Sequence, residues 1–236
     1  MPLSPQSSSK GLETFQGPWT KQTSTHLLNR VLFGAKQAEI QEFLAKGLSA
    51  SVTALLNPTD PIPSPPLNEY NTATVIDPAV APGATWINQP TNDGTINALR
   101  RNSYKKWLTG VMIHQDISIR EKMTLFWGNH FGTEADTISF GNYVYEHHDT
   151  LRKNALGNYK TMVKAVTIDP GMLRYLNGYL NSATAPDENY GRELQELYTV
   201  GKDNAVQFTE SDVKAAARVL TGWRINASFN SYFDAT

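Results

Sequence analysis

"SIREKMTLFWGNHF", residues 118–131, is the stretch that decides the fold class. It opens with the pattern of a capping box, in which the Ser118 and Glu121 side chains bond to free backbone N–H groups at a helix start. Apolar side chains follow at helical spacing, among them Met123 and Trp127. The pattern predicts a helix with one apolar face, which has to be covered by neighbouring elements.

The same kind of pattern extends towards the N-terminus. Three short helical patterns end at Gly34, at Gly47 and before Pro58, which are residues that stop helices. A longer pattern begins near Asp93 and runs to residue 114. Four helices are therefore predicted before residue 118.

Towards the C-terminus, helical patterns cover residues 138–157, 158–169, 170–178 and 186–201. A last one, residues 209–223, opens with a second, acidic capping box. From these ten patterns, some of them short, we predict eight or nine helices and no convincing strand ladder. Helices can bury their apolar stripes only against one another here, so the class is all-α, with one multi-helical domain over residues 21–236.

One segment breaks the helical pattern. Residues 57–92 contain eight of the thirteen prolines and show little periodicity. This composition predicts a long, irregular, proline-rich excursion over the surface, with at most minor strand pairing.

Composition narrows the class of protein. The chain has 236 residues, of which 40% are hydrophobic, enough to bury one ordinary core. It has no cysteine, which excludes disulfides, thiolate metal sites and a cysteine nucleophile. No phosphate-binding glycine loop and no G-x-S-x-G elbow occurs, so nucleotide-binding and α/β-hydrolase patterns are missing.

The formal net charge is −1, so we expect no nucleic-acid partner. One basic run, residues 100–107, mixes four cations with Tyr104 and Trp107. Such a mixture can hold phosphates and stack bases, but the solvated face of an amphipathic helix is the simpler interpretation.

The ends and the hydropathy of the chain bear on its location. No run of 18 apolar residues occurs, so we expect no membrane span. Residues 1–20 lack the apolar core of a signal peptide and are predicted to be a disordered leader.

"PDENYGRELQELYTVG", residues 186–201, puts carboxylates on one side of a predicted helix. Glu188, Arg192 and Glu196 are spaced i, i+4, i+8, with Glu193 at the edge of the same face. One interpretation is an ion-pair ladder worth on the order of a few tenths of a kcal/mol per pair. The other is a cleft wall that performs acid–base chemistry or binds a metal. The spacing favours the ion-pair ladder, but it does not exclude the interpretation as a cleft wall.

Two histidines fall on apolar helix faces. His130, next to Asn129, is predicted to lie inside, either as a hydrogen-bonded core residue or as a functional group. A divalent metal such as zinc, manganese or iron would suit His130 and His147 with Glu193 or Glu196. No His-x-x-x-His or Glu-x-x-His pair supports that set, so no ligand set is assigned, and His130 and Glu193 remain the candidates.

Six strings occur in an order that carries a family resemblance. They are "HLLNRVLFG" (26–34), "FWGNHF" (126–131), "LRKNALGNYKTMV" (151–163), "PGMLRYLN" (170–177), "ENYGRELQELYTVG" (188–201) and "TESDVKAAARVLTGW" (209–223). With them the chain resembles the bacterial family catalogued as domain of unknown function 1800. The resemblance implies a mainly helical protein that in many members is exported to the periplasm or beyond. It also implies a partner protein encoded nearby.

The resemblance implies a set of polar positions as well. They are His26, Arg30, Asn129, His130, Arg152, Glu188, Asn189, Arg192, Glu193, Glu196, Arg218 and Trp223. His147 and His148 depart from the family pattern, which asks for an acidic residue near Asp149. The family usually continues past its "LTGW" element into a further helical region. Its absence would leave an apolar surface near residues 219–225 and favour self-association.

Two functions from different classes are therefore expected. The first is an exported, metal-assisted hydrolase with catalytic residues His130, Arg192, Glu193 and Glu196. Its binding residues would be His26, Arg30, Asn129, Glu188, Asn189 and Arg218. The alternative is a non-catalytic helical scaffold or binding module for a protein or a polysaccharide. Convergence of His130, Arg192 and Glu193 in one pocket would favour the enzyme, and their separation would favour the binding module.

Overall fold

The computed structural model describes residues 13–59, 61–202 and 208–235. Within them the chain forms eleven α-helices, a 3-10 turn, a π-helical segment and one short β-hairpin, and the prediction of an all-α class is confirmed. The count exceeds eight or nine partly because a single helical turn, α6 (Ala135–Ile138), precedes the pattern predicted to begin at residue 138. Ser139, at φ 71°, ends this turn before α7 (Gly141–Asn154) begins.

The helices have the following bounds. They are α1 (Lys21–Val31), α2 (Gln37–Lys46), α3 (Leu48–Leu56), α4 (Gly94–His114), α5 (Arg120–His130), α6 (Ala135–Ile138), α7 (Gly141–Asn154), α8 (Tyr159–Thr167), α9 (Pro170–Tyr175), η1 (Gly178–Leu180), α10 (Asn189–Glu193), η2 (Leu194–Thr199, the π-helical segment) and α11 (Glu210–Val219).

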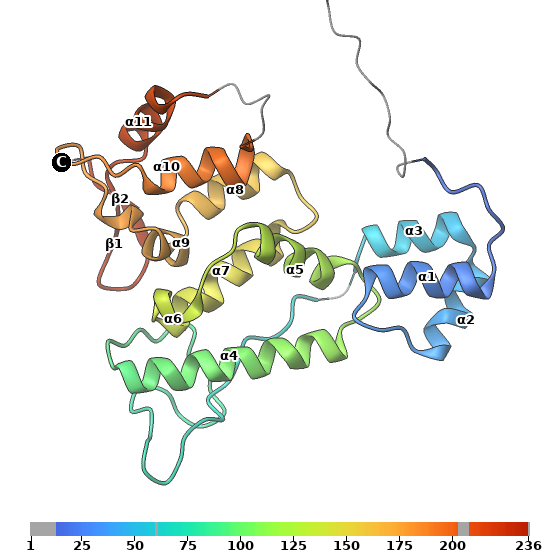
Figure 1. Ribbon diagram of the computed structural model, residues 1–236. Helices are drawn as coiled ribbons and strands as arrows, with labels where there is room; N and C mark the ends of the chain where they lie inside the picture. The colour runs from blue at the N-terminus through green and yellow to red at the C-terminus, as the bar shows by residue number, and fades with distance from the viewer. Residues whose placement is uncertain (1–12, 60, 203–207, 236) are drawn as a thin grey trace, which may run out of the picture.

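Helices α1 to α3 form an N-terminal unit with a core of its own, set to one side of the molecule in Figure 1. Leu28 and Phe43 are completely or almost completely buried in that core. The unit meets the remainder through Ile117, which packs on the same core, and through a backbone hydrogen bond from Ile119 to Leu55 (3.3 Å). Lys122 of α5 also lies over the Phe33 ring, 4.4 Å from its centre. A few contacts therefore connect two bodies that each bury apolar surface.

Helix α7 is the centre of the remainder and packs against α4, α5, α8 and α9. Arg152 of α7 forms a bidentate ion pair with Glu121 of α5, at 2.7 and 3.0 Å, and both side chains are buried. The prediction of a capping box at the start of α5 is wrong, because the Glu121 carboxylate faces the core and binds Arg152. The residue before the helix is Ile119, whose side chain makes no capping hydrogen bond.

The proline-rich segment is irregular but docks firmly onto α4 and α7. Arg100 of α4 donates to the Asp77 carboxylate at 2.7 and 2.9 Å, and neither side chain is exposed to solvent. Asn142 of α7 donates to the carbonyl of Trp86 (3.1 Å), which is itself fully buried. The segment therefore supplies part of the main core, because its polar atoms are bonded to the helices beneath it.

The C-terminal helices α8 to α11 pack around Met162, Met172 and Tyr190, and a hairpin follows. Its strands β1 (Trp223–Ile225) and β2 (Ser231–Phe233) pair antiparallel, a feature that the sequence analysis did not predict. Gly191 allows α10 to approach α11, since a Cβ there would lie 3.2 Å from the Ala217 nitrogen.

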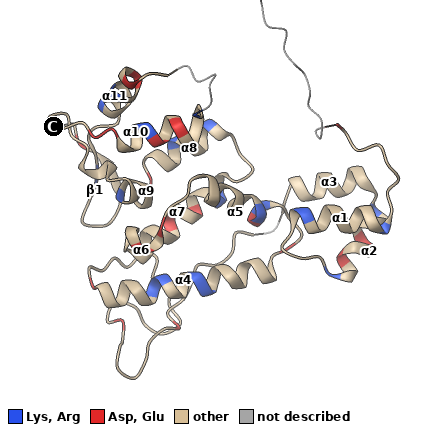
Figure 2. Cartoon of the chain, viewed as in Figure 1, with Lys and Arg blue, Asp and Glu red and all other residues tan. Residues whose placement is uncertain are grey.

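Charges are interspersed along the helices (Figure 2), and the basic run of α4 is partly used in packing. Arg100 is buried against Asp77, and Arg101 pairs with Asp136 at 3.1 Å. In the part of the chain that the structure covers, no helix combines the length and the apolarity needed to cross a membrane. Of the predicted leader, residues 1–12 lie outside the described residues. The end of it is anchored, since the Trp19 indole donates to the Phe43 carbonyl (3.2 Å).

Candidate functional site

The carboxylate face of α10 is organised by one arginine. Arg192 forms a bidentate pair with Glu210 of α11, at 2.7 and 2.8 Å, and lies 3.2 Å from Glu188 and 3.6 Å from Glu196. Lys202 bonds to Glu196 at 2.7 Å, and with Arg192 it lowers the pKa of that carboxyl. Each of these three carboxylates is paired with a cation, so this face has the form of an ion-pair ladder that joins α10 to α11.

His130 lies elsewhere, half-buried among the rings of Trp127, Phe131, Tyr159 and Tyr198. Its Nε2 is 2.9 Å from the Tyr159 hydroxyl and 3.2 Å from the Tyr198 carbonyl, to which Tyr159 also donates. That carbonyl belongs to the π-helical turn, a form of helix that is frequent at functional sites.

Two of the four predicted catalytic residues, Arg192 and Glu196, form an ion pair. Within the described residues, no hydrogen bond or ion pair joins His130 to Arg192, Glu193 or Glu196. No group of three or more His, Asp or Glu side chains in that part of the chain is arranged to hold a metal ion.

The predicted binding residues are scattered as well. His26 and Arg30 line a groove on α1, whereas Asn129 and Arg218 are exposed on α5 and α11. Asn189 donates to the Leu176 carbonyl at 3.3 Å.

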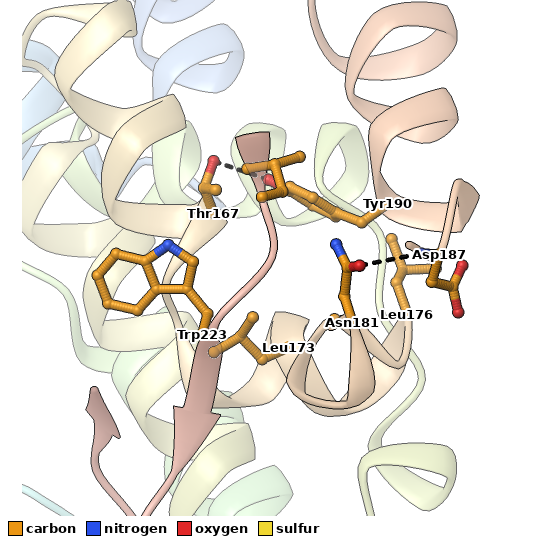
Figure 3. A pocket seen from close by; sticks show the side chains of 9 residues that line it. Thr167, Leu173, Leu176, Asn181, Asp187, Tyr190 and Trp223 are labelled. Atoms are coloured by element: carbon orange, nitrogen blue, oxygen red, sulfur yellow. Dashed lines mark hydrogen bonds between the residues drawn. The ribbon is translucent and has the colours of Figure 1, made fainter. Parts of the chain in front are cut away.

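Trp223 lines a small cavity between α9, α10 and β1 (Figure 3). Two hydrogen bonds cross its walls, from the Tyr190 hydroxyl to Thr167 (2.9 Å) and from the Asp187 nitrogen to Asn181 (2.9 Å). Its volume of about 10 Å³ is room for a single water molecule. We assign this cavity to the packing of the C-terminal helices.

Two buried networks surround α7. His147 Nδ1 bonds to Asp169 (3.0 Å), and its Nε2 has no hydrogen-bond partner among the described residues. His148 Nε2 lies 3.0 Å from the Arg152 guanidinium and must accept a hydrogen bond from it. Burial, then the charge of Arg152, lowers the pKa of His148 to about 3, so the imidazole is neutral.

A larger cleft, here called the α7 cleft, lies beside α7 and is lined by polar, charged and apolar side chains. Its volume is about 510 Å³, and its walls come from the end of the proline-rich segment, from α7 and from the hairpin loop. Polar groups dominate the lining: the amides of Asn88 and Asn230, the carboxyls of Glu146 and Asp149, Lys153 and Ser228. Asn142 also lines the cleft, but its amide is engaged in the core, where it donates to the carbonyls of Trp86 and Ile87 and accepts from Arg100. Ile87, Pro90, Tyr145 and Phe229 supply apolar surface.

The two carboxyl groups of the α7 cleft differ in their surroundings. Burial, followed by the nearby charge of Asp169, raises the pKa of Glu146 to about 7. Asp149 forms an ion pair with Lys153 at 2.7 Å. A carboxyl that keeps its proton up to about pH 7 therefore lies three residues from an ion-paired carboxylate, on one helix face.

Comparison with known proteins adds a family. The model of the family described as "Protein of unknown function (DUF1800)" matches residues 26–236. The chain belongs to this family. No curated protein and no solved structure matches the chain. Membership therefore confirms the resemblance drawn from the six strings, and the function of this family member has to be argued from its own residues.

The sequence analysis did not select the α7 cleft. The Glu146-x-x-Asp149 spacing was a readable signal, because residues three apart share a helix face. Asn88 and Phe229, however, lie 141 positions apart in the sequence (229 − 88), and no local pattern indicates that they meet.

Proposed function

We propose that this chain is a polysaccharide-binding module that holds sugar rings in the α7 cleft. The supporting observation is the combination of amides, carboxyls and ring faces in one hollow. Sugar hydroxyls both donate and accept hydrogen bonds, as amide groups do, and the C–H faces of sugar rings pack on aromatic side chains. The volume of about 510 Å³ lies within the range of roughly 300–1,000 Å³ of small-molecule sites.

The charge of the cleft narrows the class of sugar. Glu146 and Asp149 face a single cation, Lys153, which is already paired. The lining offers no unpaired cation that would neutralise an acidic sugar, so the ligand is a neutral saccharide. A polysaccharide outside the cell also fits the export that the family resemblance implies.

The test is binding of neutral hexose oligosaccharides, first on a glycan array and then by isothermal titration calorimetry. Asn88→Ala and Phe229→Ala should each weaken binding by roughly tenfold, since each removes contacts worth about 1 kcal/mol or more. Asn29→Ala, an exposed amide on α1, is the matched control and should bind like the wild type. A wild-type chain that binds none of these sugars, or variants that bind as well as it does, would refute the proposal.

A second candidate function is hydrolysis of the bound glycan, and Glu146 is the observation that favours it. An acid that keeps its proton near neutral pH can protonate the leaving oxygen of a glycosidic bond. As the C–O bond breaks, a water molecule adds its hydroxide to the anomeric carbon and gives its proton to Asp149. This assigns the acid–base role to Glu146 in place of His130, and it uses no metal.

Release of reducing ends from the bound oligosaccharide measures this activity. Glu146→Gln should keep binding and abolish release, because the amide has no proton to give. Release that continues unchanged in Glu146→Gln would eliminate hydrolysis by this residue. Binding with no release by the wild type would leave the binding module as the function.

A further inference from the structure

The N-terminal unit carries a groove that the α7 cleft does not involve. It has a volume of about 500 Å³ and runs along α1, beside the segment that precedes this helix. Phe15, Trp19, Leu27 and Leu48 supply its apolar wall, and His26 and Arg30 supply its basic groups. We call it the α1 groove.

The wall of the α1 groove is held in place by bonds to the helices. The Trp19 indole donates to the Phe43 carbonyl of α2 at 3.2 Å, which fixes one ring. Thr20 and Thr23 form a reciprocal capping box at the start of α1, and this fixes the direction in which the chain enters the helix. The groove is therefore largely formed before any ligand arrives.

The basic groups of the α1 groove have no acidic partner within the described residues. His26 and Arg30 are four residues apart on α1 and share one face, and both are exposed. Helices α1 and α3 contain no Asp or Glu. The two acids of α2 are already engaged, Glu39 with Lys36 at 3.5 Å and Glu42 with Lys46 at 3.1 Å.

We propose that the α1 groove binds an amphipathic carboxylate, a small molecule with one carboxylate head and an alkyl body the size of a medium-chain fatty acid. The planar guanidinium of Arg30 matches a carboxylate with two parallel hydrogen bonds. His26, one turn earlier, gives the head a second polar neighbour. The alkyl body covers Phe15, Trp19 and Leu27, which an ionic ligand without a tail would leave in water.

Binding of octanoate, measured by isothermal titration calorimetry, tests this proposal, with octanol as the uncharged ligand of equal chain length. Arg30→Gln should weaken octanoate binding at least about tenfold, because it removes a charge-assisted pair, and should leave octanol binding unchanged. Lys21→Gln removes one positive charge from the same helix outside the groove and should bind octanoate like the wild type.

Histidine side-chain NMR locates the ligand. On addition of octanoate the ring signals of His26 should move, while those of His114, which does not line the groove, should stay in place. The proposal is overturned by any of three results: no octanoate binding to the wild type, equal affinity of Arg30→Gln, or octanol that binds as tightly as octanoate. None of these results bears on the function proposed for the α7 cleft, because the cleft shares no lining residue with the α1 groove.

Discussion

Two arginine side chains lie entirely out of reach of solvent, and each faces a buried carboxylate. Arg100 meets Asp77, and Arg152 meets Glu121. The Arg152 guanidinium is further enclosed by the Trp107 ring, 5.1 Å from its centre, and by His148. Such a pair adds little net stability compared with an apolar pair, but loss of one member leaves an uncompensated charge in the core.

Glu121→Gln should therefore cost about 3–5 kcal/mol of unfolding free energy, measured by urea denaturation. Arg192→Gln is the control, because Arg192 makes more ion pairs but makes them at the surface, where water screens them. Arg192→Gln should lower the unfolding free energy much less than Glu121→Gln does. Equal losses in the two variants would contradict this account of Arg152.

Glu146 should make stability depend on pH. Its pKa is about 7 in the folded chain against the ordinary 4.5. Between these values the unfolded chain has lost the proton that the folded chain keeps, so stability falls as pH rises from 4.5 to 7, by up to about 3 kcal/mol.

Glu146→Gln should remove this loss. Urea denaturation at a series of pH values should show that the unfolding free energy of the variant rises relative to that of the wild type between pH 4.5 and 7. Outside this range the difference between the two unfolding free energies should stay constant. The comparison with the variant is needed because His148 acts in the opposite direction. Its pKa is lowered to about 3 in the folded chain, so its contribution is present above pH 6.5 and is lost as pH falls. Parallel curves for the two proteins would show that Glu146 titrates normally.

Local chemistry explains which of these residues the sequence could reveal. The capping box of Thr209 and Asp212 was predicted and is present, because both partners belong to one helical turn. Ser118 and Glu121 have the same spacing but form no capping box, because the Glu121 carboxylate pairs with Arg152, 31 residues further along the chain. Spacing reveals which groups can meet nearby, but competition from distant residues is invisible to it.

At the scale of elements, the N-terminal unit has a core separate from those around α7, and the two parts are joined at Ile117, at Ile119 and through Lys122. Their helices were predictable from glycine and proline stops together with apolar spacing. The α7 cleft was not, since its walls belong to an irregular segment, a helix and a hairpin loop that meet only in three dimensions.

Phe43→Ala should open the N-terminal unit selectively. The ring is almost fully buried, so its loss costs about 3–5 kcal/mol. Hydrogen exchange should rise in α1 to α3 while α7 stays protected, because few contacts connect the two bodies. Phe126→Ala, which truncates a ring that is 54% exposed on α5, is the matched control and should change little. Exchange that rises equally in α7 would show one cooperative body.

At the scale of the whole molecule, several apolar side chains near the C-terminal hairpin are exposed to solvent. Val219 is 80% exposed, Phe233 58% and Leu180 59%. An apolar surface near residues 219–225 was expected from the sequence, and self-association through it remains a proposal.

Sedimentation velocity over a range of concentrations tests that proposal. The wild type should form a reversible oligomer as concentration rises, and Val219→Lys should stay monomeric, because a charge would have to be buried in the interface. Ile76→Lys changes a residue that is 66% exposed on the proline-rich segment, and it should associate like the wild type. A wild type that sediments as a monomer throughout would end this proposal.

The docking of the proline-rich segment also has a consequence for synthesis on the ribosome. Asp77 leaves the exit tunnel 23 residues ahead of Arg100, and Trp86 leaves it 56 residues ahead of Asn142. At about 5–20 residues per second, the segment waits for seconds before its bonding partners exist. Its prolines favour an extended, hydrated chain during that interval, so we expect the segment to stay uncollapsed until α4 and α7 have emerged.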